Sequence, residues 1–231
     1  MKALSRVVDV ATVVVPGDVG PLHHKGFRQV ALVRNAPSSS WRSPWEPLPT
    51  GPTRFVLVGS IFEGRGIENL IQAAHLLQDD IQIDIYGRGR PDYMQALKEM
   101  SATGHAEDVI NWRGEIAPDQ VSATYLSAHV GLVLYDPTIP GNDGLSNKIM
   151  ECISTGRPVL AGDLPENHAF VSQHGVGWLT DLSPDNMART MREIHASPDS
   201  LKANADRARE FGRNELTWES EFDNLLRKLS N

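Results

Sequence analysis

The sequence predicts an α/β fold with a doubly wound parallel sheet. Between residue 54 and about residue 180, short apolar runs typical of buried strands alternate with segments whose apolar residues recur at helical spacing. Such alternation is typical of parallel strands joined by helices that cover both faces of the sheet. Three more helical segments, near 184–196, 199–212 and 217–229, close the chain.

The expected elements follow one another closely. The first strand is RFVLVG at 54–59, and the helix after it is marked by Ile67, Leu70, Ile71, Ala74 and Leu77. The later strands are expected at 81–87, 109–114, 130–135, 158–161 and 176–180. The helices between them are expected near 92–102, from Pro118 onward, from Ser146 or Asn147 to Gly156, and near 165–173. Pro118 favours a helix start, because a first-turn proline lacks only an N–H that would be unpaired there.

Two different segments precede this region. Residues 7–15 and 29–34 are strand-like runs, and we expect a loop between them in which His23 and His24 have no partners. Residues 36–52 hold five prolines among serines and tryptophans, a composition typical of a semi-rigid connector. Trp41 and Trp45 are expected to pack this connector against the domain.

Composition narrows the class of protein. A chain that is 40% apolar and 22% charged resembles an ordinary soluble globular protein, and its net charge of -7 disfavours nucleic acid or an anionic membrane as the main partner. The single Cys152 excludes an internal disulfide, and we expect it to be a small buried hydrophobe in a cytoplasmic protein. Charged and polar residues interrupt the valine-rich N-terminus, so we do not expect it to be a signal peptide. No run approaches the ~20 apolar residues of a membrane span.

The glycine-rich turn GSIFEGRG, at 59–66, is the first candidate site. In parallel sheets of this kind ligands bind beyond the carboxyl ends of the strands. The candidate ligand-binding loops are therefore those after Gly59, Gly87 and Arg113 and the loop 136–148. Glycines allow close backbone approach, and Arg65 adds a fixed cation, so the turn suits a phosphate; the alternative is a tight turn with a solvated arginine. Arg65 and Gly66 replace the Lys and Ser/Thr of a P-loop, which argues against an NTPase.

The helix beginning near Ser146 is the second candidate. Lys148 and Glu151, three residues apart, project to one side and either hold a ligand or form a surface ion pair, and spacing alone favours the surface pair. A lysine in the first turn opposes the helix dipole, which indicates an anion nearby. No histidine pair has metal-ligand spacing and no GxSxG occurs, so we expect no metal and no hydrolase.

Five runs in order carry a family resemblance. They are GSIFEGRGIENLIQAAHLL, IDIYGRG, INWRGEI, SAHVGLVLYDP and GLSNKIMECISTGRPVLA. Together they resemble the C-terminal, donor-binding half of a GT-B retaining glycosyltransferase of the family 4, or group 1, type. The resemblance implies a Rossmann-like domain that binds a nucleotide sugar at 53–231, a Pro-rich connector at 36–52, and the end of an N-terminal acceptor domain at 1–35.

The resemblance also implies a chemistry. The donor would be a nucleotide-diphosphate sugar, bound without an obligatory metal or other cofactor, and a hexose would pass to an acceptor with retention. The family's second acid, which binds the ribose, falls on Glu151, and its first acid, near the transferred sugar, falls on Asp143. Arg65 matches a phosphate-binding lysine, Ser60 stands where an arginine is expected, and Lys148 matches the lysine of a subgroup with an NKxxE pattern.

The predicted site therefore has two sets of residues. The catalytic set is Asp143, Arg65 and Lys148. The donor-binding set is Gly59, Ser60, Arg65, Gly87, Arg113, Gly114, Gly144, Leu145, Ser146, Lys148 and Glu151. The acceptor would be a glycan or lipid, as in cell-envelope polysaccharide synthesis, reached through a missing N-terminal domain or a partner chain, which would also supply any membrane contact. This chain alone is expected to be inactive; the alternatives are a non-enzymatic sugar-nucleotide-binding module and one half of a split transferase.

Overall fold

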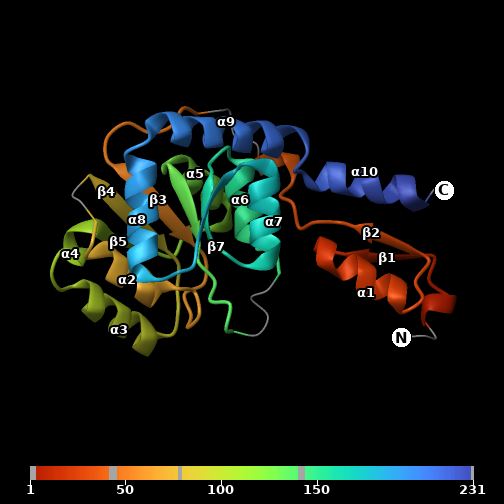
Figure 1. Cartoon of the computed structure of the whole chain (residues 1–231), viewed down its shortest axis with the longest axis horizontal. Coiled ribbons are helices and arrows are strands. Elements are labelled where there is room, and N and C mark those ends of the chain that lie inside the picture. The colour runs from red at the N-terminus through yellow and green to blue at the C-terminus, as the bar shows by residue number, and fades with distance from the viewer. Residues whose placement is uncertain (1–3, 42–45, 78–79, 140–143, 230–231) are drawn as a thin grey trace.

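A six-stranded parallel sheet forms the centre of the protein (Figure 1). The computed structural model describes residues 4–41, 46–77, 80–139 and 144–229. The strands of this sheet are β3 Thr53–Val58, β4 Ile81–Tyr86, β5 Ile110–Gly114, β6 Val130–Val133, β7 Val159–Gly162 and β8 Gly177–Thr180. Their order is β5-β4-β3-β6-β7-β8 and every pair is parallel, which confirms the predicted doubly wound sheet.

Helices cover both faces of this sheet. They are α2 Ile67–Ala74, α3 Pro91–Ser101, α4 Ala106–Val109, α5 Val121–Leu126, α6 Asn147–Ser154, α7 Pro165–His174, α8 Pro184–His195 and α9 Pro198–Asn214. Within β3, Phe55 and Leu57 join one apolar cluster while Val56 and Val58 join another on the opposite face. A strand buried on both faces is continuously apolar, which is why RFVLV reads as an unbroken run.

The N-terminal segment folds as a small unit of its own. β1 Val10–Val13 pairs in parallel with β2 Gln29–Leu32, and α1 Val19–His24 connects them. The loop expected here is therefore wrong, because Val19 and Leu22 pack against a cluster with Val13 and Val30 although Gly and Pro lower helix propensity.

The two histidines of α1 also have partners, contrary to the expectation. His23 Nδ1 lies 3.0 Å from the Phe27 carbonyl and His24 Nδ1 lies 2.8 Å from the Gly20 carbonyl. Both contacts span four residues, so they are local and follow from the helix.

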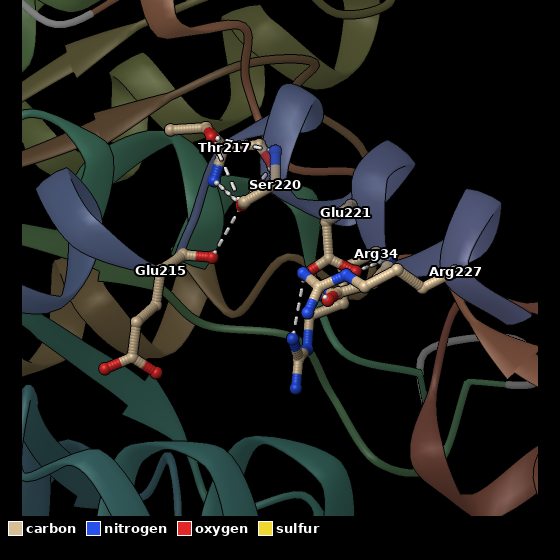
Figure 2. Close-up of polar contacts among 7 residues, drawn as sticks. Arg34, Glu215, Thr217, Ser220, Glu221 and Arg227 are labelled. Atoms are coloured by element: carbon tan, nitrogen blue, oxygen red, sulfur yellow. Dashed lines mark hydrogen bonds and ion pairs between the residues drawn. The ribbon is translucent and has the colours of Figure 1, made fainter.

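The last helix, α10 Trp218–Leu229, leaves the main domain and lies beside β2 (Figure 1). Arg34, just after β2, donates from Nη1 and from its backbone N to the two carboxylate oxygens of Glu221, at 2.8 and 3.0 Å (Figure 2). Lys228 Nζ donates to the Val30 carbonyl at 3.0 Å. Thr217 and Ser220 bond to each other at the start of α10 and fix its direction (Figure 2).

The connector is bound to the domain by a buried arginine. Arg157 is 1% exposed and donates hydrogen bonds of 2.9 to 3.1 Å to the carbonyls of Leu126, Ala128, Glu46 and Pro47. The last two belong to the Pro-rich segment, whose carbonyls are free to accept because so few of its residues take part in regular structure. The described part of the connector thus follows the domain surface.

Cys152 is fully buried in α6, as predicted. Its Sγ lies 3.3 Å from the Arg157 carbonyl, and burial raises the pKa of the thiol, so the group is unreactive. Among the described residues, no helix is both long and apolar enough to cross a bilayer.

Candidate functional site

The candidate site lies where the sheet changes winding direction. From β3 the chain proceeds outward through β4 and β5, whereas β6, on the other side of β3, leads to β7 and β8. The loops after β3 and β6 therefore meet: the Asp136 N–H donates to the Gly64 carbonyl at 2.9 Å, and a Cβ at Gly66 would lie 2.8 Å from the Leu134 carbonyl. This is the position at which doubly wound sheets bind ligands.

Arg65 is buried at the centre of these loops. Its side chain is 2% exposed, and Nη1 donates to the Tyr135 hydroxyl at 2.9 Å. The guanidinium carbon lies 4.6 Å from the centre of the Tyr135 ring and 5.9 Å from that of Phe62. Nε and Nη2 are buried without a hydrogen-bond partner among the described residues. A buried cation with two unused donors is costly, so the position suits an anion that accepts from both.

Lys148 approaches Arg65 across Gly59. A Cβ at Gly59 would lie 3.0 Å from Lys148 Cε and 3.6 Å from Arg65 Nη1, and the glycine φ is +128°. A non-glycine residue at this position would have a strained backbone conformation, and its Cβ would lie too close to the Lys148 side chain. Glycine at the end of β3 therefore lets two cations converge on one point at the carboxyl end of the sheet.

The Lys148–Glu151 pair is partly buried. Nζ lies 2.9 and 2.7 Å from the two carboxylate oxygens, and the side chains are 24% and 18% exposed. A solvated pair would be more exposed, so burial favours the ligand-holding alternative over the surface pair. Each carboxylate oxygen has a second lone pair, so Glu151 can accept from a ligand hydroxyl without releasing the lysine.

Ser146 caps α6. Its hydroxyl accepts from the Lys148 N–H at 3.2 Å, and its backbone has the extended conformation of an N-cap. The cap uses one of the N–H groups in the first turn of the helix, so the side chains of Arg65 and Lys148 are the stronger anion donors.

Two cavities meet at the Lys148–Glu151 pair. The first, of about 350 Å³, is lined by Tyr135, Gly144, Leu145, Ser146, Asn147, Lys148 and Glu151. The second, of about 320 Å³, is lined by Trp41, Val58, Gly59, Ser60, Tyr86, Gly87, Arg88, Glu115, Ile116, Pro118, Val121, Lys148 and Glu151. The pair therefore lies on the boundary of two spaces, one beside the loop after β6 and the other beside the loops after β3, β4 and β5.

The structure brings most of the predicted residues together. Gly59, Ser60 and Gly87 line the second cavity, Gly144, Leu145 and Ser146 line the first, and Lys148 and Glu151 line both. Asp143 lies outside the described residues, so the position of the family's first acid stays a prediction.

Three of the predicted residues, Arg65, Arg113 and Gly114, do not line either cavity, although Arg65 Nη1 lies 3.6 Å from the Cβ position of Gly59, which lines the second. Arg113 Nε donates to Asp84 Oδ1 at 2.8 Å, and the Gly114 carbonyl accepts from the Gly87 N–H at 2.8 Å. Glu115 and Ile116, the two residues after Gly114, line the second cavity instead, because β5 continues through Gly114.

Besides lining the second cavity, Gly87 lets two loops of the site approach each other closely. A Cβ there would lie 1.9 Å from the Gly59 carbonyl, and one at Gly89 would lie 2.3 Å from the Ile61 carbonyl. The two glycines allow the loops after β3 and β4 to run against each other, with the Ile61 N–H donating to the Arg88 carbonyl at 2.8 Å. The GxG of YGRGRPD thus serves backbone packing.

Sequence reasoning missed several lining residues. Tyr86 ends β4 and Tyr135 follows β6, so the rule that ranks strand ends could have found both. Trp41 was expected only to pack the connector against the domain. It lies 17 residues before the end of β3, and nothing in its local sequence indicates that it lines a cavity. In the described part of the chain, no three His, Cys, Asp or Glu side chains are grouped to hold a metal ion.

The sequence of this chain is similar to those of known glycosyl transferases. The sequence pattern of the family described as "Glycosyl transferases group 1" matches residues 52–197. Alpha-maltose-1-phosphate synthase of Mycolicibacterium smegmatis is 26% identical over 80% of this chain and 50% of its own length. The chain thus spans about half the length of that relative.

Two solved structures share the fold. HepE of Anabaena, in complex with UDP, superposes with a TM-score of 0.80 at 12% identity, over 99% of this chain and 68% of its own. Sucrose-phosphate synthase of Thermosynechococcus elongatus superposes with a TM-score of 0.77 at 19% identity, over 99% of this chain and 60% of its own. At such identities the likeness is one of fold.

Proposed function

Because the chain belongs to the group 1 family of glycosyl transferases and has a GT-B type C-terminal domain, we propose that it binds a nucleotide-diphosphate sugar as donor. The observation that carries the proposal is the buried Arg65, whose Nε and Nη2 are unpaired beside Lys148. A diphosphate supplies the oxygens that such a pair of cations accommodates. HepE, whose structures hold UDP and UDP-glucose, supports the same class of ligand.

The donor would extend across both cavities. The diphosphate lies against Gly59, between Arg65 and Lys148, and the ribose hydroxyls donate to Glu151. The base occupies the second cavity, which the loops after β4 and β5 line, and the sugar occupies the first, beside Gly144 and Leu145. This arrangement places the Lys148–Glu151 pair at the ribose and phosphate, where the two cavities meet.

The same cations would act in transfer of the sugar. Cleavage of the bond between the sugar and the diphosphate leaves negative charge on the leaving phosphate. Arg65 and Lys148 are held in place before the reaction, Arg65 by Tyr135 and Lys148 by Glu151, so they stabilise that charge with little reorganisation. We propose that a hexose is transferred with retention and without an obligatory metal, and that Asp143 lies near the transferred sugar.

The acceptor would enter from the side of the N-terminal unit. Asn35, after β2, donates to Asn147 Oδ1 at 3.2 Å, and the Val15 side chain lies 4.0 Å from the Cβ position of Gly144. The unit therefore borders the first cavity, where the sugar is proposed to lie. We propose that a full acceptor site, for a glycan or lipid, needs further polypeptide joined to this unit, either in the same chain or as a partner.

One half of a split transferase, or a binding module without activity, is the second candidate. It is favoured by Ser60, which stands where the family pattern has an arginine. Sugar transfer to an acceptor by the 231-residue chain alone would contradict this second candidate and our expectation that the chain alone is inactive.

Calorimetric titration with UDP, ADP, GDP and their sugars tests the donor site. We expect one nucleotide series to bind, with no requirement for magnesium. A folded chain that binds none of these ligands would overturn the proposal, and binding that depends on magnesium would overturn its metal-free form.

Variants at the two charged positions locate the ligand. Arg65→Lys should weaken the diphosphate more than the nucleoside, because the lysine replaces a fork of donors with a single point charge. Glu151→Ala should weaken both by ~1 to 3 kcal/mol, the cost of an unsatisfied partner. Asp206→Ala, which breaks the exposed Lys202–Asp206 pair of α9, is the matched control and should leave binding unchanged. Equal affinity of Glu151→Ala and wild type would return the Lys148 pair to a structural role.

A further inference from the structure

Trp41 joins the connector to the second cavity. It ends a short 3-10 turn, Ser39–Trp41, and is the one residue of the connector among the described residues that line this cavity. The other lining residues belong to β3, β4 and the segments that follow β3, β4 and β5, and to α6. A residue from outside the sheet thus takes part in the lining of this cavity.

The position of Trp41 is fixed from both directions. Its carbonyl accepts from Ser122 Oγ of α5 at 3.3 Å, and its N–H donates to the Ser38 carbonyl at 2.9 Å. Upstream, Ser39 donates through its N–H and its hydroxyl to Glu219, at 2.9 and 3.0 Å. Downstream, the Glu46 carbonyl accepts from the buried Arg157.

The neighbours of Trp41 indicate which part of a ligand it would meet. Glu115, Ile116, Pro118 and Val121 lie in the segment that leads from β5 into α5, the helix to which Trp41 is bonded. The charged groups proposed for the ribose and phosphates lie on α6 instead. Ile116, Pro118 and Val121 thus give apolar surface near Trp41, beside the exposed Arg88–Glu115 ion pair, and a flat heteroaromatic ring is the ligand part that an aromatic side chain and such surface accommodate.

We propose that Trp41 forms an aromatic wall for the nucleobase of the donor, so that the connector is part of the donor site. The proposal rests on the proposed function and deepens it, because it assigns base binding to a residue outside the sheet. Stacking of a base on an aromatic side chain is sequence-tolerant, since every base has a π-face. Trp41 then contributes affinity for nucleotides in general, and the choice of base lies with other groups of the cavity.

A base bound at Trp41 would also affect the connector. Residues 36–52 lie between the N-terminal unit and the Rossmann-like domain, and a bound base would add a contact to the connector at Trp41. Donor binding and the position of the N-terminal unit would then be linked, because the same segment takes part in both.

Titration of wild type, Trp41→Phe and Trp41→Ala with the nucleoside diphosphate that binds best, and with inorganic pyrophosphate, tests the proposal. We expect Trp41→Ala to weaken the nucleotide roughly tenfold, Trp41→Phe to weaken it less, and pyrophosphate to bind all three alike. Trp218→Ala, in the exposed part of α10, is the control and should bind as wild type does. Equal nucleotide affinity of Trp41→Ala and wild type, or an equal loss of pyrophosphate, would overturn the inference.

Tryptophan fluorescence gives a second measurement that does not depend on the alanine variant folding. Nucleotide should quench the emission of wild type and of Trp218→Phe, and the quenching should be largely lost in Trp41→Phe. The same quenching in Trp41→Phe as in wild type would overturn the role of Trp41 while leaving the donor site intact. Failure of wild type to bind any nucleoside diphosphate would instead overturn the proposed function, and this inference with it.

Discussion

The two parallel βαβ regions of this protein differ in how they are stabilised. The six-stranded domain has a core on each face of the sheet, with many side chains fully buried, such as Phe55, Leu57 and Ile83. The N-terminal unit has the same strand-helix-strand design, but among the described residues its apolar cluster has only three buried members, Val13, Phe27 and Val30, each 4 to 9% exposed. A single βαβ unit has too few strands to enclose a core, so it depends on contacts from elsewhere.

Those contacts come from the opposite end of the chain. Arg34 and Glu221 are 187 residues apart in sequence, and Glu221 is 1% exposed. Apolar side chains of α10 at helical spacing, Trp218, Phe222, Leu226 and Leu229, stay 43 to 54% exposed. The large domain is thus complete in its core, whereas the small unit and α10 leave apolar side chains exposed.

The largest expected effect comes from removing the link between the two regions. Glu221→Ala leaves Arg34 partly buried without its partner, so opening of the small unit should become easier by about 3 kcal/mol or more. Hydrogen exchange at β2, for example at Val30 and Ala31, should accelerate more than a hundredfold, while β3 keeps its protection. Asp223→Ala, exposed on the same helix, is the control. Equal acceleration in β2 and β3 would show that the two regions unfold as one.

Replacing one glycine in each region by alanine compares how tightly the two regions are packed. Gly87→Ala should destabilise the protein by ~1 to 3 kcal/mol, because the new Cβ would collide with the Gly59 carbonyl. Gly20→Ala should stabilise α1 by up to ~1 kcal/mol, because nothing lies within 4 Å of its Cβ position and alanine favours the helix. Urea unfolding of both variants measures the difference, and a change of the same sign in both would contradict it.

The smallest expected effect concerns pH and the connector. His129 accepts from the Arg54 N–H at 3.0 Å and lies 2.9 Å from the Pro49 carbonyl, and burial lowers its pKa from the ordinary 6.5. Below that ordinary value the unfolded chain binds a proton that the folded chain resists, so this contribution to stability falls as the pH is lowered. The slope is at most ~1.4 kcal/mol per pH unit.

A neutral replacement isolates this effect. Gln can accept from Arg54 and donate to Pro49 without titrating, so His129→Gln should reduce the loss of stability between pH 7 and pH 5. Urea unfolding at several pH values provides the measurement. A variant with the same pH dependence as wild type would show that other groups cause the loss.

Much of the fold could be predicted from the sequence because its strands and helices follow local rules. The run RFVLVG and the helical spacing after it gave β3 and α2 within a few residues, and Pro118 and Ser146 marked helix starts by their capping chemistry. The helix α1 was missed because its Gly and Pro argue locally for a loop, and only packing against β1 and β2 overrides them. Arg113 does not line the second cavity, because β5 continues through Gly114 before the chain leaves the sheet.

By itself, the sequence determined the class of fold, the order of the loops at the carboxyl ends of the strands, and Arg65, Lys148 and Glu151 as the charged candidates. For the Lys148–Glu151 pair the sequence favoured a surface ion pair over a ligand-binding role, because spacing along a helix says nothing about burial. Only the tertiary structure buried Arg65 with two unused donors, set it against Lys148 across Gly59, and brought Trp41 of the connector to the same cavity. The physical reason is that burial and convergence depend on segments far apart in the chain, which local propensity does not encode.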